Sequence, residues 1–150
     1  MTYLNKPLPQ DRESLFWFNV LEIPKKTANK DGESQNQLQL AFRTRIKLFF
    51  RPDGLKGSPA DAMKQVKWSQ TQQGNTLSVV GKNDSPYNVS ISSATFKVGA
   101  KEYEIESKSI TPFSSESMVV KGLTNTTSGE VNYIAINDYG GSEKITAKTN

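Results

Sequence analysis

The sequence predicts an all-β protein in which two long strands precede a complete β-sandwich. One observation is the series of short apolar clusters in the last two-thirds of the chain, separated by turn-forming stretches such as QQGN, NDSP and TSGE. Short strands at regular spacing with turns between them favour a sandwich. The other is the strict alternation of apolar and polar residues over 37–52, which is the period-2 signature of a strand with one apolar face.

The two long strands occupy the first third of the chain. Residues 14–23, SLFWFNVLEI, carry apolar side chains at both odd and even positions, which is typical of a strand buried on both faces. We therefore expect Trp17 to lie in a core. After Pro24 and a polar loop, residues 37–52 form an alternating strand far longer than the usual length of about five or six residues.

The alternating strand has two different faces. Its even-numbered positions are Leu38, Leu40, Phe42, Thr44, Ile46, Leu48 and Phe50. Its odd-numbered positions include the cations Arg43, Arg45, Lys47 and Arg51. On the pattern alone, the apolar face is most simply part of an ordinary sandwich core. The cations are then a solvated strand face that also discourages pairing between sheet edges.

The remaining elements are short. Ser58 followed by Pro59 predicts the start of one short helix in SPADAMKQ, because serine caps helices and proline suits the first helical position. The apolar clusters after it predict strands at 66–68, 77–80, 89–91, 95–98, 103–105, 118–120, 131–136 and 145–147. Trp68 is expected in their core. Residues 53–150 are close to the size of a full immunoglobulin-like sandwich, about 100 residues.

The first part of the chain does not make a domain of its own. Two long strands with apolar surfaces do not form a stable unit by themselves. Residues 1–52 are therefore predicted to be the last two strands of an immunoglobulin-like domain whose beginning is absent.

Composition argues against an enzyme. The chain has 150 residues with no cysteine and no histidine, which removes thiolate chemistry together with the commonest general base and metal ligand. We expect no enzymatic activity, no cofactor and no metal. The net charge of +4 marks a mildly basic surface, well short of the dense lysine and arginine clusters of a dedicated nucleic-acid binder.

Targeting signals are not visible either. No apolar run is long enough to span a membrane, so no membrane insertion is expected. The N-terminus, MTYLNKPLPQDRES, lacks the apolar segment of a signal peptide. On that ground alone, the chain is expected to remain in the cytoplasm.

Several stretches carry a resemblance to a known family. LPQDRESLFWFNVLEIP at 8–24, NQLQLAFRTRIKLFFRP at 36–52 and INDYGG at 136–141 resemble the periplasmic chaperones of the chaperone–usher pilus pathway, in the branch with a short loop before the long strand. NDSPYNVSI and ITPFSSESMVV look like parts of that family's second domain. The resemblance covers essentially the whole chain, but only the C-terminal two-thirds of the family's two-domain body, as in an N-terminally truncated member.

The resemblance implies a function for the long strand. Chaperones of this family complete pilus subunits, which are sandwiches lacking their last strand, by lending them a strand, and they deliver the subunits to an outer-membrane usher. This is β-strand addition, in which main-chain hydrogen bonds give affinity and alternate side chains fill pockets. The implied donor side chains are Leu38, Leu40 and Phe42. Ile46, Leu48 and Phe50 would pack the chaperone's own core.

Other site residues also follow from the resemblance. Lys47 matches the family's lysine that binds the C-terminal carboxylate of the subunit. Glu13, Arg51 and Asp138 match a salt-bridge cluster between the two domains. The family works in the periplasm. Because a second carboxylate anchor and the supporting strands lie outside this sequence, weak subunit binding or none is expected of the chain as it stands.

Two other expectations concern partners. The alternative function is nucleic-acid binding by a basic strand, with Arg43, Arg45, Lys47 and Arg51 on phosphates. Against it, these cations lie on one strand only and few aromatic residues are interleaved with them. Uncovered apolar strands at 1–52 would also drive association between copies of the chain.

Overall fold

The computed structural model describes residues 7–23 and 40–149. By contacts, the chain forms two compact units: residues 14–50 make one, and residues up to Glu13 together with those from Arg51 onward make the other. Contacts thus place Glu13 with the second unit, whereas the predicted domain boundary follows residue 52. Leu38 and the loop after Ile23 fall outside the described residues.

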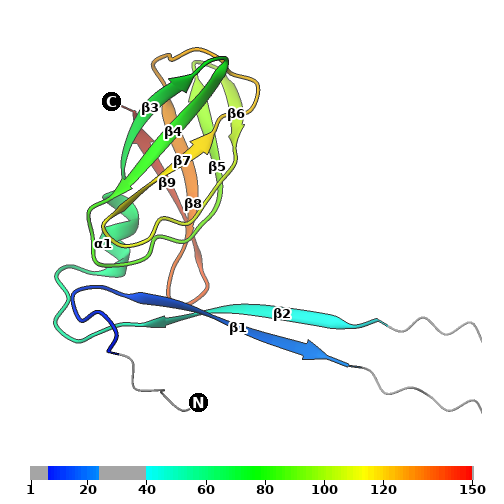
Figure 1. Cartoon of the computed structure of the whole chain (residues 1–150). Coiled ribbons are helices and arrows are strands. Elements are labelled where there is room, and N and C mark those ends of the chain that lie inside the picture. The colour runs from blue at the N-terminus through cyan, green and yellow to red at the C-terminus, as the bar shows by residue number, and fades with distance from the viewer. Residues whose placement is uncertain (1–6, 24–39, 150) are drawn as a thin grey trace, which may run out of the picture. The chain divides into compact units, whose positions relative to one another are not determined.

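The first unit is an antiparallel two-stranded ribbon of β1 (Ser14–Glu22) and β2 (Phe42–Phe50). The two strands lie side by side in Figure 1, and their register runs from the pair Ser14 and Phe50 to the pair Glu22 and Phe42. Among the described residues, β2 covers Phe42–Phe50 and is therefore shorter than the predicted strand over 37–52. β2 begins at Phe42, which pairs with Glu22, the last residue of β1.

The ribbon also corrects the prediction that β1 is buried on both faces. Phe16, Trp17 and Phe18 are 43%, 43% and 46% exposed, so Trp17 is not a core residue. Within the described part of the chain, β1 and β2 pair only with each other. Two strands without a second layer leave both faces open to solvent.

The second unit is a sandwich of two antiparallel sheets, drawn from green to red in Figure 1. One sheet has the order β3 (Lys67–Gln73), β4 (Thr76–Asn83), β7 (Ser114–Val119). The other has the order β6 (Lys101–Ile105), β5 (Ile91–Val98), β8 (Glu130–Ile136), β9 (Ser142–Lys148). Seven strands in two layers agree with the predicted sandwich.

Both sheets contribute to one core, and the short helix packs onto it. The buried side chains include Trp68 from β3, as predicted, Leu77 from β4 and Phe96 from β5. The helix α1 (Pro59–Lys64) begins after Ser58, whose hydroxyl accepts a hydrogen bond from the Asp61 backbone N–H at 3.1 Å. The predicted N-cap is confirmed.

The predicted strand at 95–98 and the last residue of the predicted strand at 89–91 belong to one strand, β5, which has an irregularity, while Val89 forms an isolated bridge to Ile110. Ile91 pairs with Ala135 while Ser93 pairs with Ile134, so Ser92 is an extra residue on β5. Such a bulge shifts the alternation by one position. Ile91 before it and Phe96 after it consequently both face the core, although one is odd and the other even. The break in parity made one strand look like two.

Candidate functional site

One face of the ribbon is apolar and exposed. The register places even-numbered residues of β1 and β2 on the same face. We call this the apolar face; its described members include Phe16, Phe18, Val20, Phe42, Ile46, Leu48 and Phe50. Of these, Phe42 is 60% exposed, and Leu40, which continues the series just before β2, is 57% exposed. The two described donor positions therefore present apolar side chains to solvent.

The opposite face carries the cations, and we call it the cationic face. Lys47 lies directly across from Trp17 in the register, and Arg45 lies across from Asn19. The Arg45 guanidinium carbon is 3.8 Å from the centroid of the Trp17 ring, and the Lys47 ammonium is 5.7 Å from it. Arg45, which the sequence assigned to solvent, is thus stacked on an aromatic ring.

Lys47 is less exposed than the neighbouring arginines. Its side chain is of intermediate exposure, whereas Arg43 and Arg45 are exposed. Partial burial lowers the pKa of Lys47 below its usual value, because desolvation disfavours the charged form. An anion that reached this ammonium would meet a charge that water solvates only in part.

Three residues predicted as a cluster lie together in the second unit. Arg51 donates from Nε to Glu13 Oε1 at 2.7 Å and from Nη1 to Asp138 Oδ2 at 2.8 Å. The Glu13 side chain is 2% exposed, and those of Arg51 and Asp138 are 36% and 42% exposed. The hydrogen bond to Asp138, and then that to Glu13, raise the pKa of Arg51 against the opposing effect of burial.

The buried carboxylate of Glu13 has further partners that the sequence did not reveal. Its Oε2 accepts hydrogen bonds from the Asn88 backbone N–H at 2.7 Å and from Asn88 Nδ2 at 3.0 Å. The Glu13 backbone N–H donates to the Pro86 carbonyl at 2.9 Å. Glu13 and Asn88 are 75 residues apart, and no periodicity links positions so distant.

Asn83 fixes the conformation of the loop at 85–88, which contains the hydrogen-bond partners of Glu13. Asn83 is buried, and its amide donates to the carbonyls of Tyr87 at 2.7 Å and Thr111 at 3.1 Å. Its Oδ1 accepts from the backbone N–H of Ser85 at 3.0 Å. A buried amide with all these bonds made gives the loop one conformation, since leaving any of them unmade is costly.

Asp138 lies at a tight turn between β8 and β9. Asn137 Oδ1 accepts from the backbone N–H groups of Tyr139 at 3.1 Å and Gly141 at 2.8 Å. Gly140 has a φ of 77°, a conformation that favours glycine. This turn chemistry, written in the sequence as NDYGG, presents the Asp138 carboxylate to Arg51.

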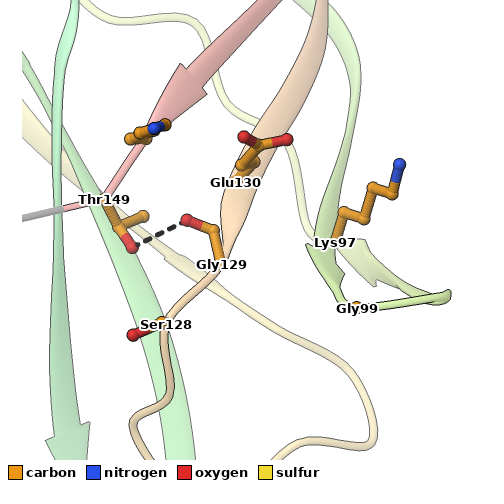
Figure 2. Close-up of a pocket in the computed structure, with 7 residues that line it drawn as sticks. Lys97, Gly99, Ser128, Gly129, Glu130 and Thr149 are labelled. Atoms are coloured by element: carbon orange, nitrogen blue, oxygen red, sulfur yellow. Dashed lines mark hydrogen bonds between the residues drawn. The ribbon is translucent and has the colours of Figure 1, made fainter.

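The sandwich also has a shallow pocket, shown in Figure 2. It is lined by Lys97, Gly99, Ser128, Gly129, Glu130, Lys148 and Thr149. Thr149 Oγ1 donates to the Gly129 carbonyl at 3.2 Å, and the Lys97 side chain extends away from that bond.

Two kinds of site do not occur among the described residues. Within 7–23 and 40–149, side chains do not gather into a group able to hold a metal ion. Over the same ranges, the structure has no helix of the length and apolarity needed to cross a membrane.

Fold and site together define an all-β protein with an immunoglobulin-like sandwich and a separate two-stranded ribbon. The model of the "Pili and flagellar-assembly chaperone, PapD N-terminal domain" matches residues 1–56. The model of the "Pili assembly chaperone PapD, C-terminal domain" matches residues 61–147. The chain therefore belongs to the pilus-assembly chaperone family.

Individual relatives agree with this assignment. The probable fimbrial chaperone YadV of Escherichia coli K12 is 50% identical over 136 residues, which are 90% of this chain and 55% of YadV. The crystal structure of YadV chaperone matches with a TM-score of 0.81 and 46% identity, covering 97% of this chain and 66% of that one.

A second solved structure is a complex. A chain from the complex of the Salmonella enterica SafA pilin with the SafB chaperone matches with a TM-score of 0.71 and 28% identity, covering 96% of this chain and 63% of that one. The present chain spans about half the length of the curated relatives it matches. Membership of this family does not support the alternative of nucleic-acid binding.

Proposed function

We propose that this chain binds pilus subunits by donating β2 and the residues just before it to complete the subunit's sandwich. The single observation that carries the proposal is the apolar face of the ribbon, which stays exposed at Leu40 and Phe42. Exposed apolar side chains at alternate positions suit β-strand addition, where each fills a pocket of the partner. Leu38 is the third donor on this proposal and lies outside the described residues.

Lys47 is the proposed anchor for the subunit's C-terminal carboxylate. It lies on the cationic face, opposite the donor side chains, and partial burial leaves its charge incompletely solvated. A charge-assisted hydrogen bond between an ammonium and a carboxylate is stronger than a bond between neutral groups. The anchor would fix where along β2 the subunit's chain ends.

Glu13, Arg51 and Asp138 are the proposed structural cluster. Glu13 immediately precedes β1 and Arg51 immediately follows β2, so their hydrogen bond joins the two segments that lead into and out of the ribbon. On this proposal the cluster holds both segments in place. The matches at 1–56 and 61–147 support a division of the chain into domains near residues 52 and 53.

Family membership supports the remaining parts of the proposal. The partners are pilus subunits and an outer-membrane usher, and the compartment is the periplasm. The SafA–SafB complex is a pilin with its chaperone, which supports the first of these partners.

The proposal is tested by Leu40→Glu with the whole chain and a purified pilus subunit. We expect subunit binding to weaken by at least about 100-fold, because an unpaired carboxylate in an apolar groove costs several kcal/mol. An NMR titration measures the effect, since it detects weak binding as well as tight binding. Leu40→Met is the control and keeps wild-type affinity. Equal affinity of Leu40→Glu and the wild type would contradict donation by this strand.

A further inference from the structure

Arg45 is held in a defined position by Trp17. The 3.8 Å separation between the guanidinium carbon and the ring centroid places the cation over the indole. Stacking uses the flat surface of the guanidinium and leaves the N–H groups at its edge available for hydrogen bonds. Arg45 is thus oriented before any partner arrives, which reduces the entropy lost when an anion binds.

Arg45 and Lys47 are neighbours on the same face of the same strand. Two residues along a strand correspond to about 6.6 Å, and both side chains are long enough to meet over that distance. Trp17 lies directly opposite Lys47 in the register, so the same indole is next to both cations. The pair is a consequence of the alternation in RTRIK together with the pairing of β1 and β2.

Within β1 and β2, the cationic face carries no acidic residue. The acidic residue of β1 is Glu22, which lies on the apolar face opposite Phe42, and β2 contains none. Two cations side by side repel each other, and an anion between them turns that repulsion into attraction. A carboxylate suits the site because its two oxygens match the planar donors of an arginine.

We propose that Arg45, positioned by Trp17, joins Lys47 in a two-cation site for the terminal carboxylate of a partner strand. The proposal rests on the proposed function, which assigns the carboxylate to Lys47 alone. Arg45 is a second ligand of the carboxylate, and Trp17 is a positioning residue that acts through Arg45.

The test compares two synthetic probes. One is a peptide with the last residues of a pilus subunit and a free terminal carboxylate, and the other is the same peptide with a terminal amide. The ratio of their affinities for the whole chain reports carboxylate recognition and cancels effects on the rest of the peptide. We expect Arg45→Ala to reduce this ratio by about twofold to fivefold, the range that an exposed ion pair reaches. Trp17→Leu reduces it by a smaller factor.

Three variants separate positioning from general damage. Arg43→Ala removes a cation from the same face that lies across from Leu21, and it leaves the ratio unchanged. Arg45→Lys keeps the charge but loses the planar guanidinium group. We therefore expect its affinity ratio to lie between those of Arg45→Ala and the wild type. Trp17→Phe keeps an aromatic face, so we expect it to retain most of the affinity ratio. That result would show that Trp17→Leu acts by removing the aromatic ring and not by unfolding the chain.

The outcomes distinguish this inference from the proposed function. If Lys47→Ala lowers the ratio and Arg45→Ala does not, the inference is wrong and the proposed function stands. If Arg45→Ala lowers the ratio while Leu40→Glu leaves subunit binding intact, the carboxylate site stands and strand donation fails. Equal binding of the two peptides to the wild type would overturn both the two-cation site and the Lys47 anchor.

Discussion

The sandwich and the ribbon both contain strands with alternating apolar residues, but only the sandwich buries them. Phe96 in the sandwich is 0% exposed, while Phe18 in the ribbon is 46% exposed. The difference is the second layer. In the sandwich, side chains from two sheets interlock in one core, whereas the described ribbon has a single layer. Alternation thus says which side chains share a face, and a facing sheet decides whether that face is buried.

The sharpest test of this comparison truncates one phenylalanine in each region. Phe96→Ala leaves a cavity in the sandwich core, and we expect it to lower the free energy of unfolding by about 3–5 kcal/mol. Phe18→Ala removes a half-exposed ring outside that core and should lower it by less than about 1 kcal/mol. Urea unfolding of both variants measures the difference. Similar losses in the two variants would mean that the ribbon is as well covered as the sandwich.

A second test addresses the ion cluster, two of whose members, Glu13 and Arg51, flank the ribbon in the sequence. Arg51→Ala leaves the buried Glu13 carboxylate with Asn88 but without its cation. We expect a loss of about 1–3 kcal/mol in the free energy of unfolding, the cost of removing a charged partner from a buried group.

The matched control for Arg51→Ala is Asp138→Asn. The Asp138 side chain is 42% exposed, so its ion pair should contribute less than about 1 kcal/mol. A larger effect from Asp138→Asn than from Arg51→Ala would place the important contact at the turn rather than at Glu13.

The exposed ribbon also predicts association between copies of the chain. Phe16 and Phe18 lie on the apolar face, and uncovered apolar surface of this kind drives self-association. Phe18→Glu should weaken it by about tenfold, because a charge replaces an apolar contact. Sedimentation across a range of concentrations measures this, with Thr95→Glu in the sandwich as a polar control. If the wild type stayed monomeric at high concentration, the prediction that the apolar face drives self-association would be wrong.

The last prediction concerns alkaline pH. Burial raises the pKa of Tyr133 to about 12 from its usual value of 10.0. The folded state therefore holds the proton more tightly than the unfolded state. Its contribution to stability is complete below about pH 10 and is lost as the pH rises toward about 12. Tyr133→Phe should remove this part of the decline, as followed by urea unfolding at several pH values.

The control for Tyr133→Phe is Tyr139→Phe. Tyr139 is 97% exposed, so its replacement should leave the alkaline decline unchanged. If both variants behaved alike, the decline would not originate in the buried phenol.

The sequence by itself determined the local features of this protein. Period-2 alternation marked which residues of β2 share a face, and serine before proline marked the start of α1. Turn-forming residues separated the strands of the sandwich. These features depend on neighbours within a few residues, so the chain's own pattern contains them. Family resemblance, rather than any pattern, pointed to Glu13, Arg51 and Asp138 as one group.

Only the tertiary structure decided features that join distant positions. The bulge at Ser92 merged two predicted strands, the exposure of Trp17 reversed its expected burial, and Asn88 proved to be a partner of Glu13. The stacking of Arg45 on Trp17 likewise depends on which residues of β1 and β2 are paired. Burial and hydrogen bonding are set by what the fold brings alongside a residue, and a one-dimensional pattern does not record those neighbours.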